Sequence, residues 1–428
     1  MRRWFSDNVG GFPRSFWYLW AGTLINRIGN FTLLYLEMYL VARYHVSASY
    51  AGLVIGLSGA GMAMGSLAGG VLADRWGRRP TMLTASLACA GATIALGSTV
   101  NTVAIPILAT TYGLFNGLAR PAFSAMLVDV LGDRARVRGF NLNYWAINLG
   151  FAGAAIIAGL LANAPRMTLF SLDAASTAIS AIWIFLRVRE TSPTHLGAIK
   201  AAGGGLRHVL TDRTFLIFVA LNFGVWTIIS TVGLMPITML DRGLSPSAYG
   251  SVIAVNGVLI VAGQLFVPKL IRGRSRTTVL AVSALLVGTG FGAVAFAPTV
   301  LLLSLTVVIW TLGEMATSPT NSSLVAELSV PTMRGRYQGV SGLSYSAAAF
   351  VAPIIGGAVI DRFGNTALWL GAFGLGAVVA LGQIASGPAR ERRVVALKAH
   401  RSAQSAAEPV ADPIPAEATA EAETSAVH

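Results

Sequence analysis

The sequence predicts an all-α membrane protein with twelve transmembrane helices, arranged as two six-helix repeats with both termini in the cytoplasm. Three observations lead to this fold class: the composition, the distribution of positive charge and an internal repeat. The chain has 428 residues, of which 54% are hydrophobic and only 11% are charged, and its mean hydropathy is +0.66. A soluble domain carries about 25% charged residues, so this chain has too little polar surface to cover a globule in water.

Apolar runs follow one another along almost the whole chain, each near the roughly 20 residues that span a bilayer. After a short cytoplasmic start at 1–14, an N-terminal bundle at 15–186 is predicted to hold spans at 15–43, 50–73, 80–99, 103–128, 139–163 and 168–186. A cytoplasmic loop at 187–213 precedes a C-terminal bundle at 214–386, with spans at 214–240, 248–268, 277–297, 299–326, 337–360 and 366–386. The remaining 387–428 are basic and then rich in Ala, Glu and Pro, which predicts a disordered cytoplasmic tail.

Positive charge alternates between the predicted loops. Most of the 31 Lys and Arg residues fall on the side that holds both termini, and the opposite side holds only Arg43, Arg166, Arg242 and Arg362. Because cytoplasmic loops carry an excess of Lys and Arg, both termini are placed in the cytoplasm. The net charge of +13 is therefore an orientation signal, which argues against nucleic-acid binding.

The two halves of the chain repeat each other. A shift of 198 residues aligns Gly52 with Gly250, Gly65 with Gly263, Pro121 with Pro319, Asp129 with Glu327, Arg138 with Arg336, and Gly159 with Gly357. A six-helix unit has thus been duplicated in parallel. Two such halves with a cavity between them form the architecture of alternating-access transporters.

A charged hairpin at 69–80, with the sequence GGVLADRWGRRP, joins the second and third predicted spans. Seven of its residues match the loop pattern G-x-L-x-D-R-x-G-R-R/K of the major facilitator superfamily: Gly70, Leu72, Asp74, Arg75, Gly77, Arg78 and Arg79. The chain resembles that superfamily over 15–386, and within it the drug:proton antiporter branch. That branch has an arginine in helix 4 at the position of Gly113, whereas here Arg120 follows seven residues later, on nearly the same helix face.

The resemblance implies a role for the hairpin as a gate. Arg78 is expected to pair with Asp129, and Asp74 to meet the start of helix 11 near Tyr337, where the helix dipole attracts an anion. These contacts would close the cytoplasmic side of the outward-open state.

Polar side chains inside the predicted spans are candidates for the substrate and proton pathway, because a charge in a bilayer is costly. Asn26, Asn30 and Glu37 share one face of helix 1, flanked by Thr23 and Arg27. Asn26 and Asn30 are interpreted as substrate contacts and Glu37 as a proton or cation site. Helix–helix hydrogen bonding, or an outer-surface position for Glu37, is the structural alternative.

Two further charged residues lie within spans. Arg120 either binds an anionic substrate group, holds a carboxylate such as Glu37, or pairs with backbone carbonyls near Pro121. Glu314 aligns with Asn116 in the repeat and is expected to face the cavity from the other half. Burial disfavours the anionic form of a carboxyl group, so the group binds a proton more readily. A proton-coupling site requires a group that binds and releases a proton. A plain interhelical hydrogen bond is the alternative.

The sequence contains no catalytic set, metal-ligand spacing or phosphate-binding loop, so neither an enzyme nor a cofactor is expected. The predicted function is proton-coupled efflux of small amphiphilic compounds, such as drugs or natural products, by a monomer in the bacterial plasma membrane. Its expected partners are the small-molecule substrate, protons and the lipid bilayer, and no nucleic acid. An importer or a sugar-type exporter, and a membrane receptor without flux, remain alternatives.

Overall fold

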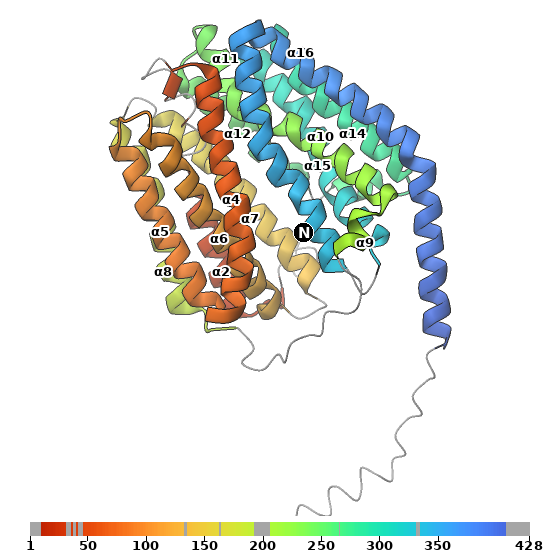
Figure 1. Cartoon of the computed structure of the whole chain (residues 1–428). Coiled ribbons are helices and arrows are strands. Elements are labelled where there is room, and N and C mark those ends of the chain that lie inside the picture. The colour runs from red at the N-terminus through yellow and green to blue at the C-terminus, as the bar shows by residue number, and fades with distance from the viewer. Residues whose placement is uncertain are drawn as a thin grey trace, which may run out of the picture.

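The computed structural model describes residues 10–30, 36, 40–41, 46–131, 135–161, 164–191, 206–264, 266–330 and 334–407. Within these residues the chain forms helices joined by short connections, and no strand is present. The helices form two groups, one from each half of the sequence, that stand beside each other (Figure 1).

The first group is built from the N-terminal half. Its helices are α2 (Arg14–Ile28), α4 (Ala48–Trp76), α5 (Arg78–Ser98), α6 (Ala104–Val130), α7 (Arg136–Leu160) and α8 (Arg166–Arg187). The short α9 (Leu206–Leu210) follows in the region predicted to be the central loop.

The second group is built from the C-terminal half. It contains α10 (Arg213–Ser230), η1 (Thr231–Leu234), α11 (Met235–Asp241), α12 (Pro246–Gly263), α13 (Val267–Ile271), α14 (Arg276–Ala293), η2 (Val294–Phe296), α15 (Val300–Leu328) and α16 (Arg334–Ala407). Gly364, with φ 82° and ψ 169°, breaks α16 into two helices, which correspond to the last two predicted spans.

Seven helices of the described chain are long and apolar enough to cross a membrane. They do not include α2, which is only 15 residues long and carries Arg27, or α6 and α7, which carry polar side chains such as Asn116, Arg120 and Asn143. These four side chains line a cavity described below. The count of twelve spans and the cytoplasmic position of the termini therefore stay predictions.

The end of the last helix differs from the sequence prediction. A disordered tail is expected from residue 387, but α16 continues as a helix to Ala407. Its extension is held by Arg393, which forms an ion pair with Asp212, the N-cap of α10. The Tyr337 hydroxyl, at the start of α16, donates to the same carboxylate at 2.8 Å. Both ends of α16 are thereby tied to the start of the C-terminal group.

Glycine allows α4 to approach two neighbours closely, as in many membrane helix pairs. On one face, a Cβ added to Gly61, Gly65 or Gly69 would lie 2.2, 1.9 or 2.3 Å from a backbone oxygen of α6. On another face, a Cβ at Gly52 would lie 2.1 Å from the Pro353 oxygen of α16. The first contact holds the N-terminal group together, and the second joins the two groups.

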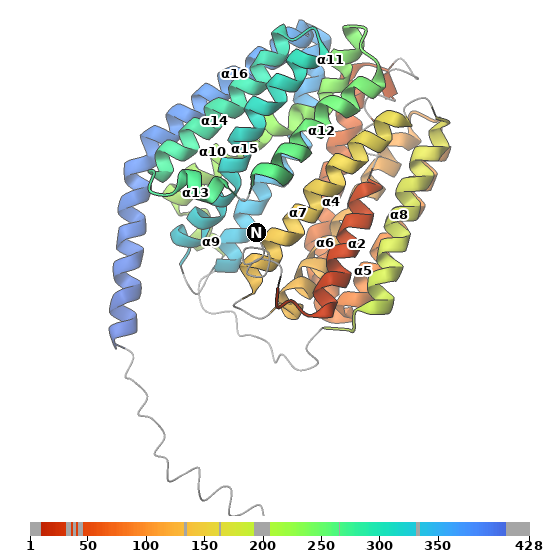
Figure 2. The ribbon, with the colours of Figure 1, turned by 180° about the vertical axis from the view of Figure 1, so that it is seen from behind.

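The two groups touch at one end of the molecule and separate at the other. At the closed end, which we define by Gly52, Gly56 and Gly59, α4 packs against the backbone and side chains of 349–354 in α16. Figure 2 shows a second seam between α7 and α12, where Trp145 donates its indole N–H to the Val261 carbonyl at 2.8 Å.

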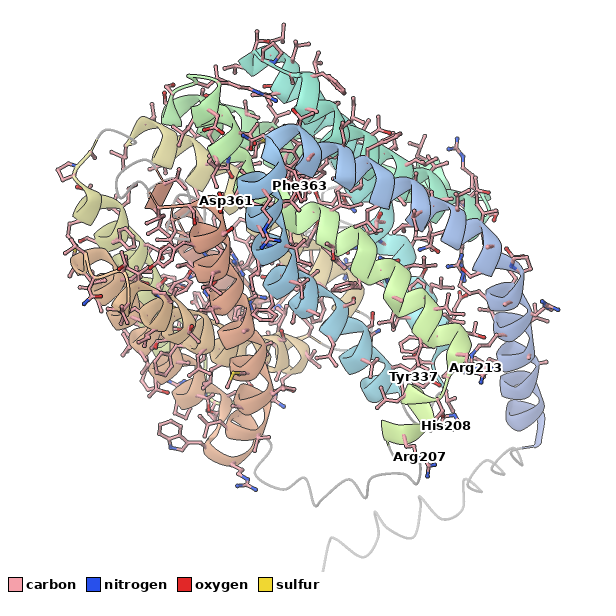
Figure 3. The ribbon with its side chains drawn as sticks, turned by 45° about the horizontal axis from the view of Figure 1, so that its top comes forward. Arg207, His208, Arg213, Tyr337, Asp361 and Phe363 are labelled. Carbon is pink, nitrogen blue, oxygen red and sulfur yellow. The ribbon has the colours of Figure 1, made fainter. Side chains whose placement is uncertain are left out.

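At the open end, where α4 finishes and α5 begins, the corresponding surfaces are free. A Cβ added to Gly70 of α4, or to Gly339 or Gly342 of α16, would meet nothing within 4 Å. Figure 3 shows the same difference along α16: Asp361 lies beside α4, whereas Tyr337 lies near Arg213 and His208 of its own half.

Candidate functional site

The charged hairpin lies at the open end and is shaped by Gly77. This glycine has φ 105° and ψ 156°, a conformation that residues with a Cβ rarely adopt, and it turns the chain directly from α4 into α5. Arg78 then forms an ion pair with Asp129 at the end of α6 and donates to the Ala125 carbonyl at 3.2 Å. The pairing of Arg78 with Asp129 implied by the sequence resemblance is confirmed.

A residue missed by the sequence analysis completes the hairpin. Glu190, just after α8, accepts hydrogen bonds from the backbone N–H groups of Arg78 at 3.1 Å and Arg79 at 3.0 Å. A carboxylate at a helix N-terminus satisfies free N–H groups and the helix dipole. The Arg79 guanidinium stacks 4.3 Å from the centroid of the Phe185 ring and donates to that residue's carbonyl. Arg75 is exposed, and the Asp74 side chain lies outside the described part of the chain.

The repeat carries the same ion pair in the second half. Arg276, at the start of α14, pairs with Glu327 near the end of α15, and both residues lie 198 positions after Arg78 and Asp129. Asp129 and Glu327, which the repeat aligns, therefore pair with arginines that the repeat also aligns. Each pair ties the helix after a hairpin to the next helix of its own half.

We expect the Arg78–Asp129 pair to stabilise the N-terminal group. The two side chains are 13% and 27% exposed, so Arg78→Asp should cost about 1–3 kcal/mol, between the values for exposed and buried pairs. The double variant Arg78→Asp/Asp129→Arg should recover most of the loss. Thermal unfolding of the purified protein measures this, with Arg75→Gln as the exposed control; a double variant no more stable than the single one would contradict it.

A second acidic contact, also missed, closes the other end of the molecule. The carboxylate of Asp361 accepts from the Ala48 N–H at 3.0 Å and the Ser49 N–H at 2.8 Å, so the first turn of α4 is capped by a residue of the other half. The signal lies in the sequence: GGAVIDRFG at 356–364 repeats GGVLADRWG at 69–77. Gly364 and Gly77 also share a positive φ. The hairpin motif is therefore present at both ends.

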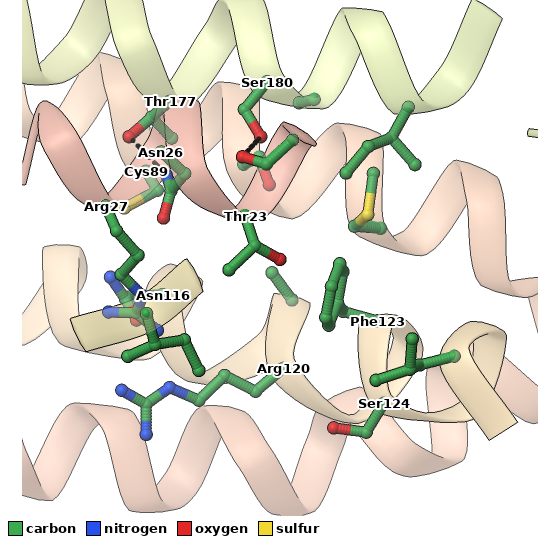
Figure 4. A pocket seen from close by; sticks show the side chains of 18 of the residues that line it. Thr23, Asn26, Arg27, Cys89, Asn116, Arg120, Phe123, Ser124, Thr177 and Ser180 are labelled. Atoms are coloured by element: carbon green, nitrogen blue, oxygen red, sulfur yellow. Dashed lines mark hydrogen bonds between the residues drawn. The ribbon is translucent and has the colours of Figure 1, made fainter. Parts of the chain in front are cut away.

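A cavity of about 460 Å³ lies within the N-terminal group. It is lined by α2, α5, α6, α7 and α8, and α16 contributes Tyr345. Among the predicted pathway residues, Asn26, Arg27 and Arg120 line it (Figure 4). The sequence predicts a cavity between the two halves, whereas the walls of this cavity come almost entirely from the N-terminal half.

The polar lining is partly satisfied by hydrogen bonds between helices. Asn26 donates to the Thr177 hydroxyl at 3.1 Å, and the Thr23 hydroxyl donates to the Asn143 amide oxygen at 2.9 Å. The structural alternative for the helix 1 stripe therefore holds for the Asn26 side chain. Asn26 nevertheless forms part of the cavity wall.

Two further predicted pathway residues that the structure describes, Asn30 and Glu314, are not part of the lining of this cavity. The helix α2 ends at Ile28, so Asn30 lies beyond its C-cap and does not continue the helical face of Asn26. Glu37 lies outside the described residues. Glu314 is absent from the lining, although its repeat partner Asn116 is part of it. It accepts instead from the Asn256 amide of α12 at 3.0 Å, which is the interhelical alternative.

The sequence model of the Major Facilitator Superfamily matches residues 19–353 and 231–411, which together cover most of the chain. The chain belongs to this superfamily. Its relatives include MFS-type transporters, and the chain is a transporter of this superfamily.

This MFS transporter is similar in sequence to several bacterial transporters. It is 25% identical over 360 residues to the uncharacterised MFS-type transporter YqjV of Bacillus subtilis, covering 81% of this chain and 87% of that protein. It is 25% identical over 366 residues to the multidrug resistance protein MdtH of Aeromonas hydrophila, with coverages of 81% and 87%. A Na⁺, Li⁺, K⁺/H⁺ antiporter of Planococcus maritimus is 23% identical over 359 residues, with coverages of 76% and 84%.

Solved structures confirm the fold. A POT family transporter in complex with 5-aminolevulinic acid superposes with a TM-score of 0.77 at 17% identity, covering 89% of this chain and 97% of that one. The nucleoside transporter NupG superposes with a TM-score of 0.74 at 14% identity, with coverages of 87% and 99%. At these sequence identities the similarity extends only to the fold. The cargo must therefore be inferred from the side chains of this MFS transporter itself.

Proposed function

We propose that this protein is a proton-coupled exporter of small amphiphilic compounds that works by alternating access in the bacterial plasma membrane. The observation that supports this best is the unequal packing of the two ends. Glycines of α4 contact α16 at the closed end. At the open end, Gly70 of α4 and Gly339 and Gly342 of α16 also lack side chains, but no atom lies against them. A second state, closed at the Gly70 end and open at the Gly52 end, would use these free glycines.

The orientation of the chain in the membrane is proposed from the charge of the loops, and the direction of transport from the names of relatives. The open end carries the arginine-rich segments around Arg78, Arg276 and Arg393, and an excess of positive charge is typical of cytoplasmic loops. In this orientation the open end of the molecule faces the cytoplasm, the side from which an exporter takes up cargo and to which an importer releases it. The names of relatives, a multidrug resistance protein and a cation/H⁺ antiporter, support efflux and exchange with protons.

Coupling is proposed to use a carboxyl group inside the membrane. Glu314, hydrogen-bonded to Asn256, is the candidate among the described residues, and Glu37 remains the candidate in helix 1. Protons, the cargo and the lipid bilayer are the proposed partners of a monomer that needs no cofactor. The pH gradient would supply the energy.

The proposal is tested in proteoliposomes that contain a trapped pH-sensitive dye. Ethidium, 2-naphthoate and a disaccharide are added in turn, with and without an imposed pH gradient, and proton flux is recorded together with cargo flux. Exchange of an amphiphilic compound for protons is expected. Movement of cargo and protons in the same direction would indicate an importer, disaccharide flux would indicate a sugar exporter, and no flux under any gradient would contradict transport.

We expect Asp74→Asn to slow transport at least about tenfold, because the proposed latch needs an anion against the N-terminus of helix 11. Binding to the inward-open state should change little, since the latch is absent from that state. Initial rates of flux and equilibrium binding measure the two effects separately. Glu391→Gln, on an exposed part of α16, is the control, and wild-type rates in Asp74→Asn would refute the latch.

A further inference from the structure

Two arginine side chains enter the cavity from different helices. Arg27 comes from α2 and Arg120 from α6, and Figure 4 shows both guanidinium groups at the same end of the cavity, beside Asn116. Their positive charges repel each other. Two like charges that face one space of low dielectric are unfavourable unless an anion lies between them or near them.

The described residues balance this charge only in part. Asp173, buried in α8, attracts Arg27, so the part of the lining that the structure describes sets one carboxylate against two positive charges. The Arg120 Nε is buried and has no hydrogen-bond partner. This Nε–H group is therefore not paired with a backbone carbonyl near Pro121, which was the structural role considered from the sequence. An N–H donor buried without a partner costs free energy, and a bound acceptor would recover it.

The rest of the cavity is suited to an apolar body with few polar groups. Phe115, Phe123 and Phe140 line it together with Met82 and Leu127. The volume of about 460 Å³ falls in the range of pockets that enclose a drug-sized ligand. Figure 4 shows Phe123 away from the two guanidinium groups. The cavity therefore offers both charged and aromatic surface, as an amphiphilic ligand requires.

We propose that the cargo of this cavity is an amphiphilic anion, with a carboxylate, sulfonate or phosphate group held between Arg27 and Arg120 and an apolar body against the phenylalanines. The inference rests on the transport function proposed above and narrows its substrate class. Guanidinium groups bind such anions through paired, charge-assisted hydrogen bonds. A cationic compound of the same shape would be rejected by the same arginines.

The test uses three naphthalene probes of one shape and different charge: 2-naphthoate, 2-naphthylmethanol and 2-naphthylmethylammonium. Their binding to the full-length protein in lipid nanodiscs is measured by calorimetry. 2-Naphthoate should bind at least about tenfold more tightly than the other two. Arg27→Gln and Arg120→Gln should each weaken 2-naphthoate about tenfold and leave 2-naphthylmethanol within about twofold.

The control variant is Arg392→Gln, which removes an exposed arginine from the extension of α16 and should leave all three affinities unchanged. Retained binding of 2-naphthylmethanol shows that Arg27→Gln and Arg120→Gln are folded; if it is lost, Arg27→Lys and Arg120→Lys replace them, with the same order of probes expected. Equal affinity for the anion and the cation, unchanged 2-naphthoate binding in both Gln variants, or no binding of any probe would overturn the inference.

Flux measurements distinguish this inference from the proposed function. If proteoliposomes exchange the ammonium compound for protons and ignore 2-naphthoate, the exporter stands and the anion site is wrong. If 2-naphthoate binds through the arginines but nothing moves under any gradient, the anion site stands and the proposed transport is wrong.

Discussion

Replacing Gly52 by leucine is expected to abolish transport. A Cβ at this position would lie 2.1 Å from the carbonyl oxygen and 2.8 Å from the carbonyl carbon of Pro353. Both are backbone atoms, so no flexible side chain can move aside, and α4 and α16 would have to separate. The closed end would then stay open, the cycle would stop, and cargo flux should fall below about one hundredth of the wild-type rate.

The separation of the two halves expected in Gly52→Leu can be measured directly. Spin labels at Thr102→Cys and Pro298→Cys, on a Cys89→Ala background, report the distance between the two halves at the closed end. Gly52→Leu should lengthen this distance. Gly91→Leu is the matched control, because a Cβ at Gly91 meets nothing within 4 Å. Wild-type flux in Gly52→Leu, or an unchanged distance with loss of flux, would contradict closure through this glycine.

The sequence predicted the architecture because the relevant signals are local or periodic. The apolar runs, the 198-residue repeat and the hairpin motif together indicated two homologous halves of one superfamily. The pairing of Arg78 with Asp129 followed from the resemblance. The second pair, Arg276 with Glu327, follows from the same repeat once the first is known. Such features need only the order of residues and the geometry of helices.

The site was predicted less well because its geometry depends on packing between helices distant in sequence. Asn26, Arg27 and Arg120 do line the cavity, and their role in a substrate or proton pathway stays a prediction. Asn30 was grouped with Asn26 on the assumption of a continuous helix, and α2 ends before it. Glu314 was assigned by analogy with Asn116, but the two halves do not contribute equally to the cavity.

The two missed acids illustrate the same limit. Glu190 lies in a polar stretch with no periodic pattern, and its role depends on the turn at Gly77 that presents two N–H groups to it. Asp361 does have a sequence signal, the second copy of the hairpin motif. Recognising it requires comparing two segments that are predicted to lie on opposite sides of the membrane. The parallel 198-residue repeat obscures this inverted relationship.

The position of Glu314 supports a coupling role at the interface of α12, α15 and α7. Asn256 donates to Glu314 at 3.0 Å and to the Thr311 hydroxyl at 3.0 Å. The amide is buried, so both contacts are made away from water. Because α12 also contacts α7 across the seam between the halves, a change in the charge of Glu314 would act where the two groups meet.

Glu314→Gln is therefore expected to separate cargo exchange from proton movement. Glutamine keeps the size and the hydrogen bond to Asn256 but cannot release a proton, so counterflow should continue while uphill transport driven by a pH gradient falls at least about tenfold. Glu391→Gln, at an exposed position, should change neither. If Glu314→Gln still concentrates cargo and Glu37→Gln does not, the proton is carried by helix 1 and the assignment to Glu314 is wrong.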